Sequence, residues 1–279
     1  MSLTIFEEYA PVLASLNDAE IDDPQSVQRL KMADERIGTR QVEMIYAPFD
    51  HINTSARVVI VGMTPGRFQA SNALRSARRA LLEGQTVSEA AAAAKSFASF
   101  SGEPMRTNLI RMLDSIGVGR WLGLTSTASL WSERNDLVHF NSALRYPVFV
   151  DGQNWSGTPD MVKTPALRQW LEAYTGQELR LLSEALIVPL GPKVAEAMKH
   201  LAAKGVVDEG RILEGLPHPS GANAERIAFF LGDKAAEHCS AKTNPEALSA
   251  AKSRLEQRIA ALSPATINSV HDQVSRVHG

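Results

Sequence analysis

The stretch VVIVGMTPGRFQ, residues 58–69, decides the fold, because an apolar β-branched run stops abruptly at a turn that contains glycine and proline. Four consecutive Val and Ile residues are typical of a strand buried on both faces, as in a parallel sheet with helices on each side. Open α/β sheets bind their ligands at loops that leave the carboxyl ends of the strands. The turn at residues 62–66 is therefore the first candidate for a functional site.

The same plan of strand, glycine turn and helix recurs at residues 185–203, which favours a parallel sheet. Residues 137–144 predict another strand that runs on into residues 145–150, and residues 211–223 are expected to give a short last strand followed by a compact loop. Helices are expected at residues 71–83, 86–96 (with Thr86 and Glu89 at the spacing of a capping box), 105–116, 164–174 (with Gly176 as the stop), 192–203, 224–230 and 244–262.

The first fifty residues are acidic, and we expect them to be mainly helical. Asp23-Pro24 followed by residues 25–32 resembles the start of a helix with proline in its first turn. Residues 42–48 predict either a short strand or an extended approach to the main sheet.

The chain has 279 residues, of which 44% are apolar, so it can bury a substantial core. We expect a single domain over residues 1–279, with a core at about 42–240 and helical extensions at 1–41 and 241–279. No apolar stretch approaches the roughly 20 residues that span a bilayer, and the first residues do not form a signal peptide. We therefore expect a cytoplasmic protein that does not bind membranes.

Cys239 is the only cysteine, which excludes internal disulfides and metal sites built from several thiolates. We interpret it as a free thiol, and we expect neither a metal ion nor another cofactor. The net charge of −2 argues against a generally cationic surface. Residues 57–82, however, contain five arginines and no acid. This local positive charge either meets phosphates or forms a solvated helix face.

Three polar loops stand at the ends of predicted strands: the turn at residues 62–66, Asn141-Ser142, and His218-Pro219-Ser220. In this order they resemble the uracil-DNA glycosylase superfamily. The first loop is most similar to the Gly-Met-Asn-Pro-Gly and Gly-Ile-Asn-Pro-Gly loops of its single-strand-selective and mismatch-specific branches. The resemblance covers roughly residues 57–231.

The resemblance implies a three-layer α/β/α fold with a central, mainly parallel sheet, to which this chain adds helices at both ends. It implies hydrolysis, without a metal, of the N-glycosidic bond of a damaged or deaminated base in DNA, as in base excision repair. The partner would be DNA, single strands included, or another nucleobase-containing ligand. Such an enzyme flips the base out of the helix.

Hydrolysis of this bond leaves positive charge on the sugar and negative charge on the departing base, so a site needs a hydrogen-bond donor, a held water and a stacking surface. The resemblance implies that Asn141 reads the base edge, that His218 donates to the base oxygen and that Thr64 stands at the water-positioning place. Further candidates are Gly62, Met63 and Phe68 around the base, and Arg67, Arg75, Arg78, Ser220 and Asn223 on phosphates or DNA.

Each role has a simpler alternative. His218 could stabilise a turn, Asn141 could cap the following turn through its side chain, and Phe68 could belong to the core. The two glycines of the first turn need only satisfy backbone geometry.

Two departures from the family pattern bear on activity. Thr64 stands where the family places aspartate or asparagine, and a hydroxyl cannot act as a carboxylate base, so general-base help of about 10²- to 10⁴-fold is missing there. Gly221-Ala222-Asn223 also lacks the residue that wedges into the base stack. We therefore expect weak activity on duplexes, a preference for single strands, or a different substrate.

Three functions remain open from the sequence. The first is a DNA N-glycosylase. The second is a non-catalytic module that binds nucleic acid or a nucleobase, and the third is an N-glycosidase that acts on free nucleosides or nucleotides.

Overall fold

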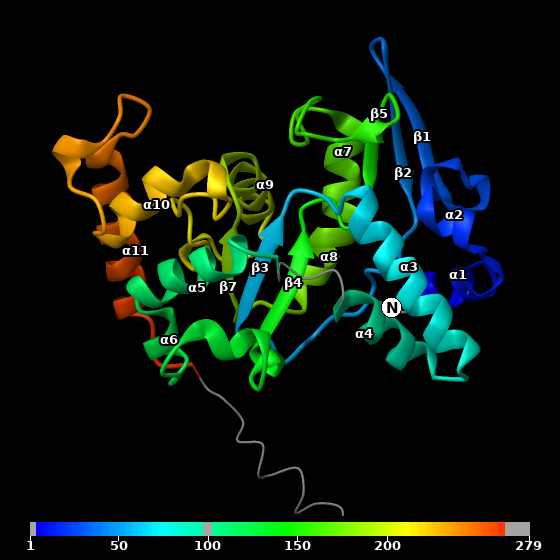
Figure 1. Ribbon diagram of the computed structural model, residues 1–279, viewed down its shortest axis with the longest axis horizontal. Helices are drawn as coiled ribbons and strands as arrows, with labels where there is room; N and C mark the ends of the chain where they lie inside the picture. The colour runs from blue at the N-terminus through cyan, green and yellow to red at the C-terminus, as the bar shows by residue number, and fades with distance from the viewer. Residues whose placement is uncertain (1–3, 97–101, 266–279) are drawn as a thin grey trace, which may run out of the picture.

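The protein has a mixed α/β fold built on two sheets (Figure 1). The computed structural model describes residues 4–96 and 102–265. A three-stranded parallel sheet has the order β4-β3-β7, and a four-stranded antiparallel sheet has the order β1-β2-β5-β6. The parallel strands are β3 (Val58–Gly62), β4 (Val138–Ser142) and β7 (Leu186–Pro189), and the antiparallel strands are β1 (Lys31–Ile37), β2 (Arg40–Ile45), β5 (Val148–Val150) and β6 (Gln153–Asn154).

Strand β3 is the centre of the parallel sheet, and all five of its residues are buried. Val58 and Ile60 pack into one apolar cluster, and Val59 and Val61 pack into another. The prediction of a strand buried on both faces is confirmed, as are the parallel strands that flank it. The short last strand expected within residues 211–223 is reduced to a single parallel bridge between Ile187 and Ile212.

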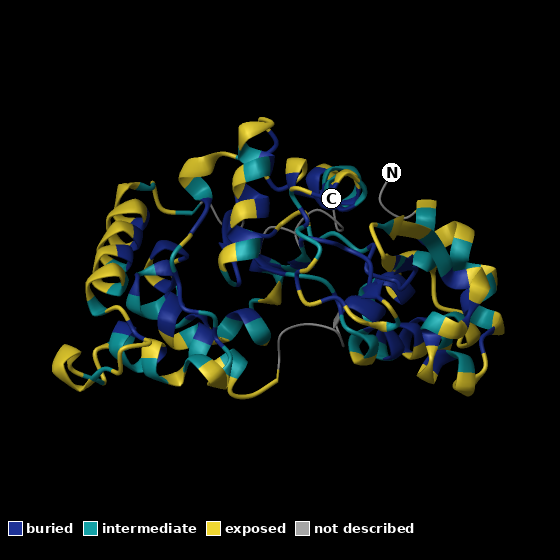
Figure 2. Ribbon diagram, turned by 90° about the horizontal axis from the view of Figure 1, so that it is seen from above, coloured by how far each residue is buried: buried dark blue, intermediate teal, exposed yellow. Residues whose placement is uncertain are grey.

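Helices cover both faces of this sheet, as the two clusters show. Beside Val59 and Val61 lie residues of α1 (Thr4–Ser15), α3 (Arg67–Leu82), α4 (Val87–Ser96), α8 (Gln177–Arg180) and α9 (Pro192–Ala203). Beside Val58 and Ile60 lie residues of α5 (Met105–Ser115), α6 (Val118–Trp121), α10 (Ala224–Leu231) and α11 (Pro245–Ala261). Buried segments occupy the interior in Figure 2, and the outer turns of the helices are exposed.

The antiparallel sheet was not predicted, and the helix expected over residues 25–32 is wrong. After α2 (Asp18–Asp22), the chain makes two 3₁₀ turns, Pro24–Ser26 and Gln28–Leu30, and then enters β1. Strand β1 turns at Gly38, whose φ of +62° suits a tight hairpin, and pairs with β2, which itself pairs with β5. This pairing overrides the local preference for a helix, so the segment before residue 42 is not a purely helical extension.

The region between β4 and β7 also differs from the expectation. Residues 145–150 leave the parallel sheet and join the antiparallel one as β5. The helix α7 (Pro165–Trp170) does not stop at Gly176 but continues through a π-helical turn, Leu171–Gly176, into α8. Gly176 has helical dihedral angles, and a Cβ there would lie 3.4 Å from Leu201, so the glycine serves close helix packing.

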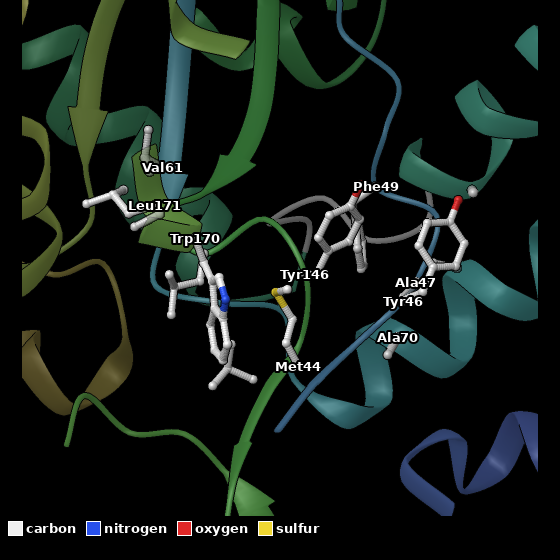
Figure 3. Close-up of a cluster of buried hydrophobic side chains, with 14 of the residues drawn as sticks. Met44, Tyr46, Ala47, Phe49, Val61, Ala70, Tyr146, Trp170 and Leu171 are labelled. Atoms are coloured by element: carbon white, nitrogen blue, oxygen red, sulfur yellow. The ribbon is translucent and has the colours of Figure 1, made fainter. Parts of the chain in front are cut away.

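Side chains from both sheets meet in one apolar core (Figure 3). Met44 and Tyr46 come from the end of β2 and the loop after it, Tyr146 from the segment before β5, and Trp170 from α7. The ring of Tyr46 stacks on Tyr9 of α1 at 3.9 Å between ring centroids. The first fifty residues are thus packed against the body of the protein. Within the described part of the chain, no helix has the length and apolar character needed to cross a bilayer.

Candidate functional site

A cavity of about 780 Å³ lies at the carboxyl ends of β3 and β7. The turn after β3 contributes Gly62 and Met63 to its wall, and the turn after β7 contributes residues 190–193. The remaining lining residues come from α5, the loop after β6, the loop before α10, and α10 and α11 with the segment between them: Met105, Ser156, Gly215, Leu216, Pro217, His218, Asn223, Arg226, Lys242, Asn244, Ala247 and Leu248. The cavity therefore occupies the position where the sequence predicted a ligand.

Glycine is required in two of the turns that shape the cavity. Gly191 has a φ of +100°, and a Cβ there would lie 3.5 Å from the ring of His218. Gly215 has a φ of +113°, and a Cβ there would lie 3.0 Å from the Cβ of Ala251. Side chains rarely adopt these conformations, so the two glycines bring three chain segments close together around the cavity.

His218 presents a hydrogen-bond donor in this cavity. The backbone N–H of Ser220 donates to Nδ1 of His218 at 3.2 Å, and the Ser220 hydroxyl lies 3.0 Å from the same nitrogen. Because a backbone N–H only donates, Nδ1 carries the lone pair and the neutral ring carries its proton on Nε2. Burial lowers the pKa of His218, which favours the neutral ring. In the described part of the structure, Nε2 has no protein hydrogen-bond partner.

Ser220 and Asn223 belong to the same loop. The Asn223 amide donates to the hydroxyl of Ser220 at 3.2 Å, and Asn223 itself lines the cavity. Ser220 therefore holds the His218 ring, and the structure brings three of the predicted site residues together. It also places Gly62 and Met63 across the same cavity.

Asn141 lies one strand away, at the end of β4, and does not line the cavity. It pairs in register with Val61 and is only 6% exposed. Its Oδ1 accepts the N–H of the adjacent Ser142, the last residue of β4, at 2.8 Å. Its Nδ2 is buried and has no partner among the described residues. An unpaired buried donor lowers the stability of the folded protein by about 1–3 kcal/mol. The Nδ2 group is therefore able to donate a hydrogen bond to an acceptor on a ligand.

Thr64 is engaged in structure. Its hydroxyl donates to the carbonyl of Tyr146 at 3.0 Å and accepts the N–H of Val148 at 3.2 Å. These two bonds tie the turn after β3 to the entrance of β5. The hydroxyl does not line the cavity, and neither does any Asp or Glu of the described residues.

Phe68 and the arginines of α3 lie outside the cavity. Phe68 is 78% exposed, so the alternative that placed it in the core is wrong, and the structure does not bring it to the other site residues. Arg67, Arg75 and Arg78 each form an ion pair with an aspartate of the α2 region: Asp23 at 2.6 Å, Asp22 at 2.6 Å and Asp18 at 2.5 Å, respectively. Contacts from these arginines to phosphates stay a prediction that requires the ion pairs to open.

Three cations of the cavity were missed from the sequence: Lys193, Arg226 and Lys242. Lys193 lies in the first turn of α9, directly after the glycine turn that follows β7, and that position was a signal in the sequence. Arg226 and Lys242 had no such signal, because their place depends on how the loop after α10 folds back.

A second polar cluster was also missed, and it is buried between α4, β4 and α8. Glu178 is buried and accepts hydrogen bonds from Lys95 Nζ at 3.1 Å and from Arg145 Nε at 2.8 Å, and its carboxylate also contacts His139. Burial alone raises the pKa of Glu178, but the charges of Arg145 and Lys95 outweigh it and hold that pKa well below its usual range. Burial and the charge on Lys95 lower the pKa of His139 to about 4. The cluster ties three elements together by charge.

Comparison with known proteins gives one relative. No family model matches the chain, and no solved structure matches it. The uncharacterized protein YoxB of Bacillus subtilis (strain 168) is 35% identical over 197 residues, which cover 70% of this chain and 77% of YoxB. The chain therefore belongs to the same protein family as YoxB.

Proposed function

We propose that this protein is a uracil-DNA-glycosylase-like DNA N-glycosylase that removes a damaged or deaminated base, with a preference for single strands. The observation that carries the proposal is the cavity at the carboxyl ends of β3 and β7, where His218 offers its Nε2–H and the described lining contains cations but no acid. The fold supports it: helices flank both faces of the parallel sheet, as in the three-layer arrangement of that superfamily. A single-domain organisation and a cytoplasmic location go with this proposal.

The proposed chemistry follows from the charges of the reaction. Water adds to the sugar carbon, the carbon–nitrogen bond breaks, and the base leaves with the bonding electrons. The proton that the added water loses ends on the released base, so the products are a sugar hydroxyl and a neutral base. A neutral imidazole that donates through Nε2 stabilises the developing negative charge on a base oxygen. Because no carboxylate of the described residues lines the cavity, nothing there repels an anionic base or a phosphate.

Asn141 supports recognition of the base edge. Its Nδ2 is a buried donor without a partner at the end of β4, next to the strand that leads into the cavity. A carbonyl oxygen of the base would satisfy this donor. Asn141 does not line the cavity, so its contact with the base requires a rearrangement near the end of β4.

A second candidate is binding without cleavage. It is favoured by Thr64, whose hydroxyl is already used twice, and by the absence of a described acid on the cavity wall. Without a general base, a glycosylase depends on a largely dissociative step, and we expect its turnover to be slow.

The test is base release from DNA. Single- and double-stranded oligonucleotides that carry uracil, hypoxanthine or a mismatched thymine are incubated with the protein, and abasic sites are then cleaved with alkali and counted. We expect the protein to release the base from single strands, and we expect this activity to be lost in the variants His218→Ala and Asn141→Ala. His238→Ala is the matched control, because His238 is exposed and does not line the cavity. If no substrate releases a base while the oligonucleotides still bind in a His218-dependent manner, the enzyme proposal fails and the binding proposal stands.

A further inference from the structure

The cations of the cavity have no acidic partner. Lys193, Arg226 and Lys242 line the same cavity, and no carboxylate of the described residues lies within ion-pair distance of any of them. Three arginines of α3 are the opposite case, because each of Arg67, Arg75 and Arg78 is paired with an aspartate. The three cations of the cavity are therefore available to a ligand.

Lys193 is held in place by the chain opposite to it. Its Nζ donates to the carbonyl of Gly157 at 2.6 Å. Gly157 has a φ of +98°, and a Cβ there would come within 2.5 Å of the same Nζ, so only glycine lets the backbone approach the ammonium this closely. One hydrogen bond to a carbonyl fixes the side chain and leaves two donors of the ammonium for a ligand.

Arg226 and Lys242 are joined on another part of the wall. Arg226 donates to the carbonyl of Lys242 at 2.9 Å and to Oδ1 of Asn223 at 3.3 Å. These bonds hold the backbone of Lys242 against α10, and they keep the guanidinium at the cavity. The guanidinium of Arg226 therefore lies beside the backbone of Lys242.

Glu225 fastens the loop that carries Lys242. Its carboxylate accepts hydrogen bonds from Lys234 Nζ at 2.7 Å, from the Ser240 hydroxyl at 2.6 Å and from the Thr243 hydroxyl at 2.6 Å. These donors hold the pKa of Glu225 below its usual range. The carboxylate of Glu225 is thus turned to the loop, and its contacts hold the loop that carries Lys242 against α10.

We propose that Lys193, Arg226 and Lys242 form a phosphate clamp, so that the ligand is a nucleotide recognised through one or a few phosphates and not through a long nucleic-acid backbone. This inference rests on the proposed function, because it names the substrate class of the same cavity. Three cations that line one cavity without an acid among its described lining residues suit a phosphate, and the first turns of α9 and α10 add partial positive charge. A free nucleoside monophosphate and a nucleotide within a short single strand share this chemistry.

The number of phosphates is measurable, because each phosphate that a protein neutralises steepens the salt dependence of binding. Binding is measured over a range of about 50 to 300 mM KCl. The ligands are deoxyuridine, deoxyuridine monophosphate and uracil-containing single strands of increasing length. We expect the monophosphate to bind more tightly than deoxyuridine. Affinity should stop rising after the shortest strands. The logarithm of the binding constant, plotted against the logarithm of the salt concentration, should have a slope of about −1.4 to −2.1, which corresponds to roughly two or three phosphates.

The variants separate the clamp from the arginines of α3. Lys193→Ala and Lys242→Ala should each weaken binding of the monophosphate about tenfold, as expected for loss of a charge-assisted hydrogen bond. Lys199→Ala, which removes a lysine that pairs with Glu214 outside the cavity, should leave it unchanged. Competition between the monophosphate and a short strand shows whether both sources of the phosphate use the clamp. The inference would be overturned if affinity kept rising with strand length and Arg78→Ala weakened the binding of long strands. That result would favour an extended nucleic-acid binding surface on α3.

The clamp and the proposed function fail in different ways. If base release depends on His218 but deoxyuridine and its monophosphate bind equally, the clamp is wrong and the glycosylase proposal survives. If the clamp variants weaken binding and no DNA substrate releases a base, the clamp is supported and the hydrolysis is not. Circular dichroism of each variant confirms that it is folded.

Discussion

The hydroxyl of Thr64 donates a hydrogen bond to the backbone carbonyl of Tyr146 at 3.0 Å and in return accepts the N–H of Val148 at 3.2 Å. This side chain therefore fastens the turn after β3 to the entrance of β5. The family resemblance places the residue that positions the attacking water at Thr64. In the structure, the hydroxyl of Thr64 instead links the two sheets through these two hydrogen bonds.

Thr64→Val should lower the stability of the protein. The substitution keeps the shape of the side chain and leaves a carbonyl and an N–H without their partner, which costs about 1–3 kcal/mol. Urea unfolding measures the change, and Thr64→Ser, which keeps the hydroxyl, should remain within about 1 kcal/mol of the wild type. If Thr64→Val abolished base release with no loss of stability, the hydroxyl would instead be holding the water.

Glu178→Gln should destabilise the protein strongly. The change leaves Arg145 and Lys95 buried without their carboxylate, and breaking a buried ion pair from one side costs about 3–5 kcal/mol. Glu172→Gln is the matched control, because Glu172 lies in the helical segment just before, and its partners His200 and Lys204 are partly exposed. We expect that control to cost less than about 1 kcal/mol in the same urea titration.

The stability of the protein should fall on acidification from about pH 6.5, the ordinary pKa of histidine, towards pH 4. His139 has a folded pKa of about 4. Between these two values the unfolded chain binds more protons than the folded one, so the free energy of unfolding rises with pH. His139→Gln should remove this part of the slope, and the difference between the two titrations isolates it from Asp50 and other buried acids. An unchanged slope in the variant would mean that the folded protein accepts the proton on His139.

Base release should be flat through neutral pH and fall only at acidic pH. Burial lowers the pKa of His218, so the neutral ring that donates through Nε2 persists below the usual histidine range. A pH profile of single-turnover rates measures the midpoint. A rate that rises on acidification would show that the imidazolium, not the neutral ring, is the active form.

Local patterns predicted the elements whose signal lies within one segment. The apolar run at Val58–Gly62 and the capping box of Thr86 and Glu89 needed no distant partner, and both are present in the structure. The strand alternative for residues 42–48 is confirmed at residues 42–45 of β2, whereas β1 was missed because it forms at the edge of the sheet by pairing with β2.

The same limit applies to the site. The loop of His218 is local, so its residues were found together. Lys242 reaches the cavity only because Glu225 binds the loop that carries it, and a carboxylate 17 positions earlier in the chain gives no pattern that sequence periodicity can detect. Glu178 meets Lys95 and Arg145 from three separate elements for the same reason.

The segment that follows β4 is held in place by two buried carboxylates, which lowers the entropy that a ligand must lose on binding there. Soon after Asn141 it passes Arg145, which is bound to Glu178, and Tyr146, whose hydroxyl donates to the fully buried Asp50 at 2.6 Å. Two buried acids thus immobilise the chain directly behind the unpaired amide. The scaffold has already restricted this stretch during folding, so a ligand that engages Asn141 gives up little conformational entropy there, and preorganisation of this kind raises affinity without adding a contact.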